Sequence, residues 1–295
     1  MASSSKRLSA LSRLFSSTVF RELAAKGKSA VFTRLIHDAD VLPRRVNNVL
    51  VRDVFETGFE ILQQGGARDE YIYKAALTHR ILLGKHNLRT ACMLSEFRAG
   101  ECKADIAILN GTSTVYEIKS ERDSLSRLER QIENYRKVFA SVFVIAGENH
   151  VDAVLDAMPS DVGVMGLDRR YYISTRRKAK NQPGRICPVT VFESLRTDEA
   201  KKLLSGLGFA IPNVPNTRLR TELRKRFEIL HPEEVHAGML RTLKETRDLQ
   251  PLAALVAQLP DSLQAAALSV PLRRGDHDRL VGAVNTPLAH ALAWS

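Results

Sequence analysis

Cysteine is scarce in this chain, and its few cysteines follow no recognisable pattern. The 295 residues include Cys92, Cys102 and Cys187, an odd number with neither Cys-x-x-Cys spacing nor the Cys/His spacing of a zinc finger. This pattern excludes a disulfide-rich secreted scaffold and the common structural zinc sites. We therefore expect a reducing, cytoplasmic setting.

Long apolar runs are missing as well. The stretch LAALVAQL that begins at Leu252 contains Gln258 and is followed by Pro260. A helix that crosses a bilayer needs about 20 consecutive apolar residues. We therefore expect no membrane-spanning segment.

Acidic residues are absent from the first 21 positions, which carry four basic side chains. This composition fits a mitochondrial targeting peptide or a basic amphipathic helix of the mature protein. Leu8, Leu11, Phe15 and Val19 recur at helical spacing, and the same style of sequence continues past any cleavage point. We favour the helix.

Positive charge dominates the composition. Lys and Arg number 44 against 33 Asp and Glu, which gives a formal net charge of +11. Such a balance favours a polyanionic partner, either nucleic acid or an anionic membrane surface. An apolar content of 44% is enough for a packed core, so the chain is not a disordered polymer.

Hydrophobic periodicity divides the chain into three segments. Residues 1–66 are predicted to be a helical N-terminal segment, residues 67–186 an α/β core, and residues 187–295 a small helical C-terminal domain. A basic loop at residues 169–185 contains seven Lys and Arg and no acid. We expect this loop to be a linker or a surface that contacts a substrate.

The predicted core begins with a helix at residues 69–83. Period-two patterns then predict strands at residues 91–97, 104–109 and 114–119, with Asn110-Gly111 as a turn. A helix at 124–139, a strand at 141–146, a helix at 151–158 and a strand at 162–167 follow. The fold class is therefore α/β, with an αβββαβ order and a mixed sheet.

Three charged residues stand in the apolar hairpin ADIAILNGTSTVYEIKS. Side chains alternate along a strand, so Asp105 can face the same spot as Glu117 and Lys119 on the partner strand. Two carboxylates buried together repel each other unless a cation lies between them. A divalent metal with a lysine beside it suits hydrolysis of a phosphodiester, because the metal activates water and the lysine stabilises phosphoryl oxygens.

The tripeptide Glu-x-Lys is not specific by itself. It occurs at Glu101, Glu117 and Glu199. The first lies in a turn and the third in a predicted helix, so only the second lies on an apolar strand paired with one that carries an Asp. The alternative to a metal site is a solvent-exposed hairpin face with a cross-strand ion pair.

These residues resemble the PD-(D/E)XK nuclease superfamily, which has a restriction-endonuclease-like core, and an uncharacterised bacterial branch of it. The resemblance covers residues 69–167 and departs from the motif where Ala104 replaces Pro. It implies that Asp105, Glu117 and the Ile118 carbonyl bind Mg²⁺, with Mn²⁺ as a substitute, and that Lys119 is the catalytic lysine. Glu96 would be a third metal ligand. Gln131 would be a further catalytic residue on the helix beside the site, and Tyr135 follows it one turn later.

The resemblance implies a Mg²⁺-dependent endonuclease that acts on DNA, in a setting such as phage defence. A homodimer, or a separately encoded recognition partner, is a further expectation. We expect nucleic-acid contacts from Arg127, Tyr135, Arg176, Arg177, Lys178 and Lys180. A non-catalytic nucleic-acid-binding or regulatory protein that keeps the fold is the main alternative, and a membrane-surface or protein-interaction module is another.

Overall fold

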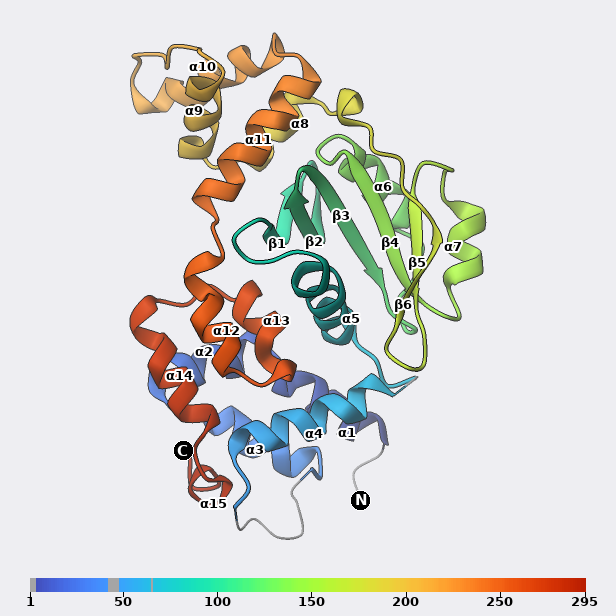
Figure 1. The fold of residues 1–295 in the computed structure, drawn as a ribbon, viewed down its shortest axis with the longest axis vertical. Coiled ribbons are helices and arrows are strands. Elements are labelled where there is room, and N and C mark those ends of the chain that lie inside the picture. The colour runs from blue at the N-terminus through green and yellow to red at the C-terminus, as the bar shows by residue number, and fades with distance from the viewer. Residues whose placement is uncertain (1–3, 42–47, 65) are drawn as a thin grey trace. The chain divides into compact units, whose positions relative to one another are not determined.

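The chain forms two compact units. The computed structural model describes residues 4–41, 48–64 and 66–295. The unit that we call the helical unit contains residues 1–81, 169–172 and 251–295, and the sheet unit contains residues 82–168 and 173–250. The sheet unit is therefore contributed by the middle of the chain, and the helical unit by both ends (Figure 1).

Segments from both ends of the chain pack together in the helical unit. The Phe32 ring lies 5.8 Å from that of Trp294, and the Thr33 hydroxyl donates to the Ala291 carbonyl at 3.0 Å. Leu50 forms a β-bridge with Pro287. The helices of this unit are α1 (Ser4–Leu14), α2 (Ser17–Lys26), α3 (Ala30–Asp38), α4 (Val51–Gln63), α5 (Glu70–Leu77), α12 (Ala253–Gln258), α13 (Asp261–Ser269), α14 (His277–Val284) and α15 (Leu288–Ala291).

A six-stranded mixed sheet forms the centre of the sheet unit. Its spatial order follows the sequence: β1 (Cys92–Ala99), β2 (Cys102–Asn110), β3 (Thr112–Lys119), β4 (Ser141–Gly147), β5 (Gly163–Leu167) and β6 (Ile173–Arg177). β1, β2 and β3 pair antiparallel as a meander, and β3, β4 and β5 pair parallel. The predicted α/β class and mixed sheet are confirmed, and the predicted strands correspond to β1 to β5.

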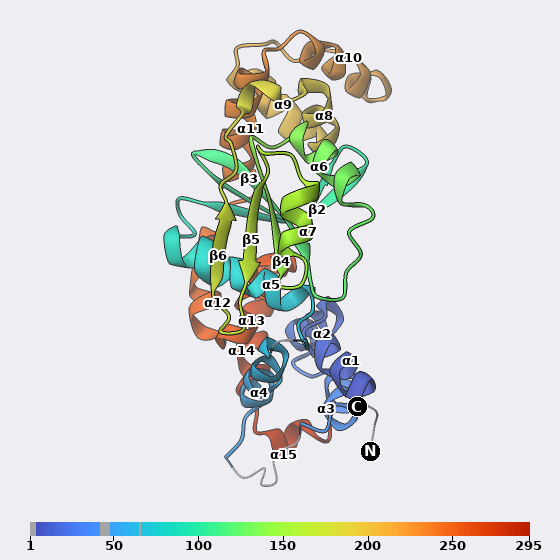
Figure 2. The same ribbon diagram turned by 90° about the vertical axis from the view of Figure 1, so that its right-hand side faces the viewer.

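Helices cover one face of this sheet. Leu128 and Ile132 of α6 (Leu128–Arg136) and Val151 of α7 (Val151–Ala157) join alternate residues of β4, such as Val142 and Val144, in one buried cluster. The same cluster extends into α8 (Pro188–Ser194), α9 (Thr197–Gly206), α10 (Asn216–Glu228) and α11 (Pro232–Thr246). Figure 2 shows α7 in front of β4 and β5.

The predicted basic loop contains a strand. Residues 173–177 form β6, which pairs antiparallel with β5 at one edge of the sheet. Lysine and arginine are common on edge strands because their charges oppose pairing with another chain. A run of basic residues therefore identified an exposed segment, while its pairing depended on β5, which lies earlier in the chain.

The three predicted segments do not coincide with the two units. Residues 187–250 belong to the sheet unit, whereas residues 251–295 belong to the helical unit. The predicted helix at 69–83 forms α5 followed by a π-helical turn (Thr78–Leu83), and α5 also groups with the helical unit. Periodicity identifies helices but does not show which distant helices they pack against.

No helix in the described part of the chain is long and apolar enough to cross a membrane.

Candidate active site

The registers of β1, β2 and β3 place three carboxylates in one row. Ser95 and Phe97 pair with Ile106 and Ala104, so Glu96 lies opposite Asp105. Continuing the β2–β3 register by one position beyond Ile106 and Tyr116 places Asp105 opposite Glu117. Residues in one row of neighbouring strands have their side chains close together. The hairpin therefore brings Asp105 and Glu117 to one part of the sheet, as its alternation predicted, and Glu96 lies beside them on β1.

Glu96 and Asp105 lie close together on β1 and β2. One carboxylate oxygen of each lies within 4.8 Å of the other. Like charges directly opposite each other destabilise a strand pair. Glu96 also has a φ of 52°, a left-handed conformation that side chains other than glycine rarely adopt. Backbone strain of this kind costs about 1–3 kcal/mol and is common at functional sites.

The Asp105 carboxylate is held at the end of β3. The Ile118 amide donates a hydrogen bond to Asp105 Oδ2 at 2.7 Å. This contact links the acid on β2 to the residue between Glu117 and Lys119. The position of the Asp105 carboxylate therefore follows the backbone of the Glu-x-Lys strand.

Glu117 and Lys119 form a buried ion pair. Lys119 Nζ lies 2.9 Å from Glu117 Oε1, and the two side chains are only 6% and 2% exposed. A solvent-exposed hairpin face would leave both groups in water, so that interpretation is wrong for this pair. Removing two charges from water is costly unless other polar groups complete their hydrogen bonds.

Gln131 and Tyr135 on α6 complete those hydrogen bonds. Gln131 accepts from Lys119 Nζ at 3.0 Å and donates through its amide nitrogen to Glu117 Oε1. The Tyr135 hydroxyl lies 2.6 Å from Glu117 Oε2 and 2.7 Å from the Lys103 carbonyl. The spacing of one helical turn thus places both side chains on the same ion pair.

Burial controls the ionisation of this cluster. It raises the pKa of Glu117, and the Lys119 charge and the hydrogen bonds from Tyr135, Lys119 and Gln131 only partly oppose it. Burial, followed by the Glu117 charge, also raises the pKa of Tyr135 well above its ordinary value. Tyr135 is therefore a permanent hydrogen-bond donor at neutral pH.

The three predicted acidic metal ligands do not form one tight group. Among the described residues, Glu117 is not in a set of three ligand atoms that all lie within 4.8 Å of one another. Its oxygens instead accept hydrogen bonds from Lys119, Gln131 and Tyr135. The row of carboxylates is thus divided between the neighbours Glu96 and Asp105 and the neutralised Glu117.

Two of the predicted nucleic-acid contacts are buried or occupied. Tyr135 is fully buried, so its ring is not available to nucleic acid. Arg177 donates to the backbone carbonyls of Val162, Leu155 and Met158 at 2.7, 3.1 and 3.0 Å, which ties β6 to the end of α7. Both side chains therefore hold the fold together.

The other predicted contacts remain at the surface. Arg127 precedes α6, Arg176 is on β6, and Lys178 and Lys180 follow that strand; all four are exposed. Their positions are compatible with contacts to phosphate groups.

A turn after β3 was not anticipated. Asp123 Oδ2 accepts hydrogen bonds from the Ser120 amide at 2.8 Å and the Ser120 hydroxyl at 2.7 Å. The predicted helix began at residue 124, but α6 begins at Leu128. An acid that accepts from the amide three residues earlier makes the contact of a capping box, and the Ser-x-x-Asp spacing is the signal that could have revealed it. The turn fixes the chain directly after Lys119.

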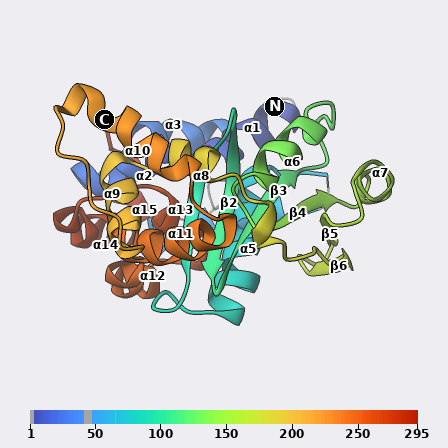
Figure 3. The same ribbon diagram turned by 90° about the horizontal axis from the view of Figure 1, so that it is seen from above.

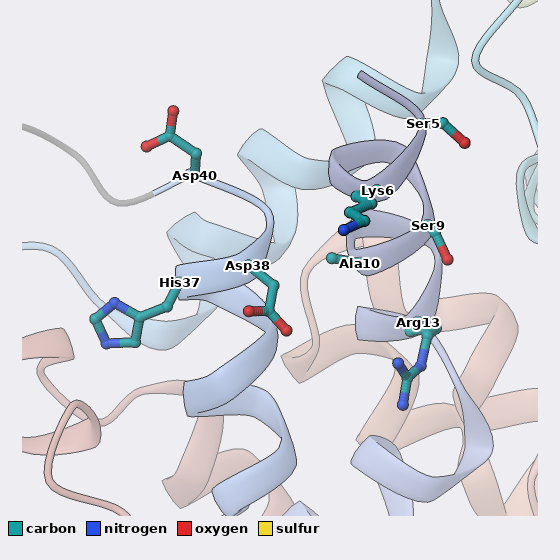
Figure 4. Close-up of a pocket in the computed structure, with 8 residues that line it drawn as sticks. All are labelled: Ser5, Lys6, Ser9, Ala10, Arg13, His37, Asp38 and Asp40. Carbon is teal, nitrogen blue, oxygen red and sulfur yellow. The ribbon is translucent and has the colours of Figure 1, made fainter. Parts of the chain in front are cut away.

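The helical unit has a separate hollow of about 840 Å³ (Figure 4). Lys6 and Arg13 project from α1 toward the last turn of α3, where Asp38 points back toward them. Ser5, Ser9, Ala10, His37 and Asp40 complete the lining. None of the predicted site residues contributes to this hollow.

Comparisons with known proteins identify one family. A family model described as bacteriophage P4 protein cII matches residues 63–253, a range that includes the whole sheet unit. Protein cII of Enterobacteria phage P4 is 32% identical over 115 residues, which are 38% of this chain and 43% of the phage protein. The chain therefore matches less than half the length of that relative.

A solved structure shows weaker similarity. The SPO1766 protein of unknown function from Silicibacter pomeroyi is 18% identical, with a TM-score of 0.31, over 50% of this chain and 97% of that chain. This similarity is too low to support an argument about fold or function.

Proposed function

The chain belongs to the bacteriophage P4 protein cII family, and we propose that it is a metal-dependent nuclease that hydrolyses phosphodiester bonds, in DNA rather than RNA. The description of this family names no activity. The proposal therefore depends on the charged side chains of the sheet unit. We propose that this unit is a restriction-endonuclease-like core. The observation that carries the proposal is the buried Glu117–Lys119 pair beside the neighbouring carboxylates Glu96 and Asp105.

The acids fit a divalent cation such as Mg²⁺ or Mn²⁺. Carboxylate and carbonyl oxygens are the ligands that Mg²⁺ prefers. Glu96 and Asp105 would hold the cation, and Glu117 and the Ile118 carbonyl could supply further oxygens, because each carboxylate oxygen accepts more than one bond. When bound, the cation would offset charge on the phosphoryl oxygens and lower the pKa of a water molecule.

Lys119 has a donor available for the substrate. Its ammonium group carries three N–H donors. Two of them are directed to Glu117 Oε1 and Gln131 Oε1. The third can donate to a phosphoryl oxygen or orient the attacking water, where a fixed donor stabilises the developing charge.

Gln131 and Tyr135 position this lysine. Gln131 bridges the two charges, and Tyr135 holds the second oxygen of Glu117. A side chain held by several partners loses little entropy when the substrate binds, which favours catalysis. We therefore assign Lys119 a catalytic role and the two α6 residues a positioning role.

A non-catalytic nucleic-acid-binding protein is the competing function. The observation that favours it is the ion pair of Glu117 with Lys119, because this carboxylate already has a cationic partner without a metal. The basic surface and the net charge of +11 suit either function.

A cleavage assay separates the two functions. Purified protein is incubated with supercoiled plasmid, linear duplex, single-stranded DNA and RNA in Mg²⁺, Mn²⁺ or EDTA. We expect cleavage of DNA with either metal and none in EDTA. Asp105→Asn and Lys119→Ala should each reduce the rate at least about 100-fold, because an electrostatic group at the reacting centre is lost.

Lys103→Ala is the matched control. Lys103 on β2 ends another Glu-x-Lys tripeptide, and its side chain is exposed, whereas that of Lys119 is buried. This variant should cut at the wild-type rate, and circular dichroism should show that every variant is folded. Folded wild type and variants that all bind DNA and never cut it would establish the binding function instead.

A further inference from the structure

A second hollow lies on the helix-covered face of the sheet, near α7 and the edge strand β6. Its volume is about 490 Å³, within the usual range for small-molecule sites. Figure 3 shows α7 beside β5 and β6, the elements that form most of its wall. The lining residues are Glu148, Val151, Asp152, Leu155, Gly166, Asp168, Ser174 and Arg176.

Strand registers connect this hollow to the proposed catalytic lysine. Lys119 pairs with Ala146, Ala146 with Gly166, and Gly166 with Ser174. These four residues therefore form one row across the sheet. Neighbouring strands lie about 4.8 Å apart, so Gly166 is roughly 10 Å from Lys119. A nucleotide that flanks a phosphate at Lys119 can reach this distance.

Gly166 keeps the floor of the hollow open. A Cβ atom there would lie 3.2 Å from Val151 Cγ2 and 3.4 Å from the Ser174 hydroxyl. The same atom would lie 3.9 Å from Arg176 Nε. The guanidinium group of Arg176 is thus placed over a floor that has no side chain.

A β-bulge directs Arg176 into this position. Val164 pairs with Arg177, but the next residue, Met165, pairs with Thr175. Arg176 is therefore the extra residue on β6. Bulges of this kind redirect a side chain and are common next to active sites.

The charges of the lining restrict the occupant. Arg176 and Asp152 make no ion pair or hydrogen bond within the described part of the chain, although both line this hollow. Their opposite charges can be bridged by a ligand that has acceptors at one edge and donors at another. The carboxylates of Glu148, Asp152 and Asp168 would repel a phosphate group, and a simple cation has no acceptor for the Arg176 guanidinium.

We propose that this hollow binds one unstacked guanine base of the nucleic-acid substrate, next to the phosphate at Lys119. Guanine offers O6 and N7 as paired acceptors for an arginine. Its amino and imino groups can donate to a carboxylate such as that of Asp152. Val151 and Leu155 supply apolar surface for the ring. The choice of ligand rests on the proposed nuclease function.

Nucleotide binding tests this proposal without catalysis. Isothermal titration calorimetry in EDTA compares guanosine, cytidine, adenosine and uridine monophosphates on the 295-residue chain. We expect guanosine monophosphate to bind most tightly. Inosine monophosphate, which lacks the 2-amino group, and 7-deazaguanosine monophosphate, which lacks N7, should each bind about tenfold more weakly.

Variants assign the two contacts. Arg176→Ala should weaken guanosine monophosphate about tenfold and remove the preference over the 7-deaza analogue. Asp152→Asn should remove the preference over inosine monophosphate, and Gly166→Val should weaken all binding by filling the floor. Arg89→Ala is the matched control, because it removes the same charge from an exposed position before β1, at the opposite edge of the sheet and outside the lining. It should leave the guanine preference unchanged.

Equal binding of all four nucleotides, or an unchanged preference in Arg176→Ala, would overturn the proposal. Tighter binding of another nucleotide would also overturn the assignment to guanine. A protein that prefers guanine but never cleaves DNA would disprove the nuclease and retain the base-binding hollow. A protein that cleaves DNA without this preference would do the reverse.

Discussion

Two buried glutamates of the sheet unit differ in the direction in which folding shifts their pKa. Glu199 on α9 contacts Arg247 through both oxygens, at 2.8 and 3.0 Å, and Glu117 on β3 contacts Lys119 at 2.9 Å. Burial acts to raise both pKa values. Hydrogen bonds from Arg247 and the Arg196 amide reverse this effect at Glu199, whose pKa is lowered. At Glu117 burial prevails.

The difference distinguishes a structural ion pair from the pair that we propose to be functional. A two-pronged arginine contact satisfies a carboxylate more completely than a lysine does. Arg247 also lies over the Phe97 ring, 5.1 Å from its centre, and so connects the end of α11 to β1. The charge of Glu117 is held at a cost to stability, as expected of a group kept for chemistry.

Breaking the structural pair should have the largest effect. Arg247→Ala leaves Glu199, only 3% exposed, as a buried charge without its main partner. We expect the sheet unit to lose about 3–5 kcal/mol of stability. Hydrogen exchange of the β1 and β2 amides measures this unit directly. Arg130→Ala, which removes an exposed pair with Glu101, should cost less than about 1 kcal/mol and is the control. Equal losses in the two variants would contradict the comparison.

Removing both charges of the Glu117–Lys119 pair should raise the stability of the sheet unit instead of lowering it. The double variant Glu117→Gln with Lys119→Met removes both buried charges at similar volume, and we expect it to stabilise the sheet unit by about 1–4 kcal/mol. The same variant should not cleave DNA. Unfolding in urea, followed by hydrogen exchange, gives the stability. A loss of stability would show that Glu117 and Lys119 are a structural pair like Glu199 and Arg247.

Acidification should affect the structural pair. Because the pKa of Glu199 is lowered by folding, its contribution to stability is present above the unfolded value of about 4.5 and is lost as the pH falls through the folded value. Glu199→Gln should therefore differ most from wild type at neutral pH, and the difference should shrink on acidification. Unfolding free energies measured from pH 7 to pH 3 test this. A gap that widens at low pH would contradict the sign.

Relieving the strain at Glu96 should have the smallest effect. Glycine adopts a φ of 52° without steric cost, so Glu96→Gly should stabilise the sheet unit by about 1 kcal/mol. Glu96→Ala removes the carboxylate but keeps the strain, and the difference between the two variants isolates the backbone term. If alanine stabilises as much as glycine, charge repulsion explains the cost and strain does not.

The hairpin and its helix could be predicted because their signals are local. Alternation along β2 and β3 placed Asp105, Glu117 and Lys119 together, and the resemblance to the nuclease superfamily placed Gln131 beside them. The division of the acids could not be predicted. It depends on Tyr135 reaching Glu117 from another element, a contact that no spacing within one strand encodes.

Edges and boundaries were less predictable. The β6 strand forms only because β5 pairs with it, and its basic residues alone indicate a solvated loop. The hydrogen bonds from Arg177 to three backbone carbonyls could not be predicted either, because the end of α7 lies close to Arg177 only after β6 has paired with β5. The partnership of the chain ends depends on contacts such as Phe32 with Trp294, separated by most of the sequence.

The division of the chain also sets an order of events during synthesis. The whole sheet unit lies between residues 82 and 250, so it can assemble as soon as those residues have left the ribosome. The early helices must wait for residues 251–295 to cover their apolar surfaces. A nascent chain arrested before residue 251 should therefore contain a finished sheet and an open, chaperone-binding set of N-terminal helices.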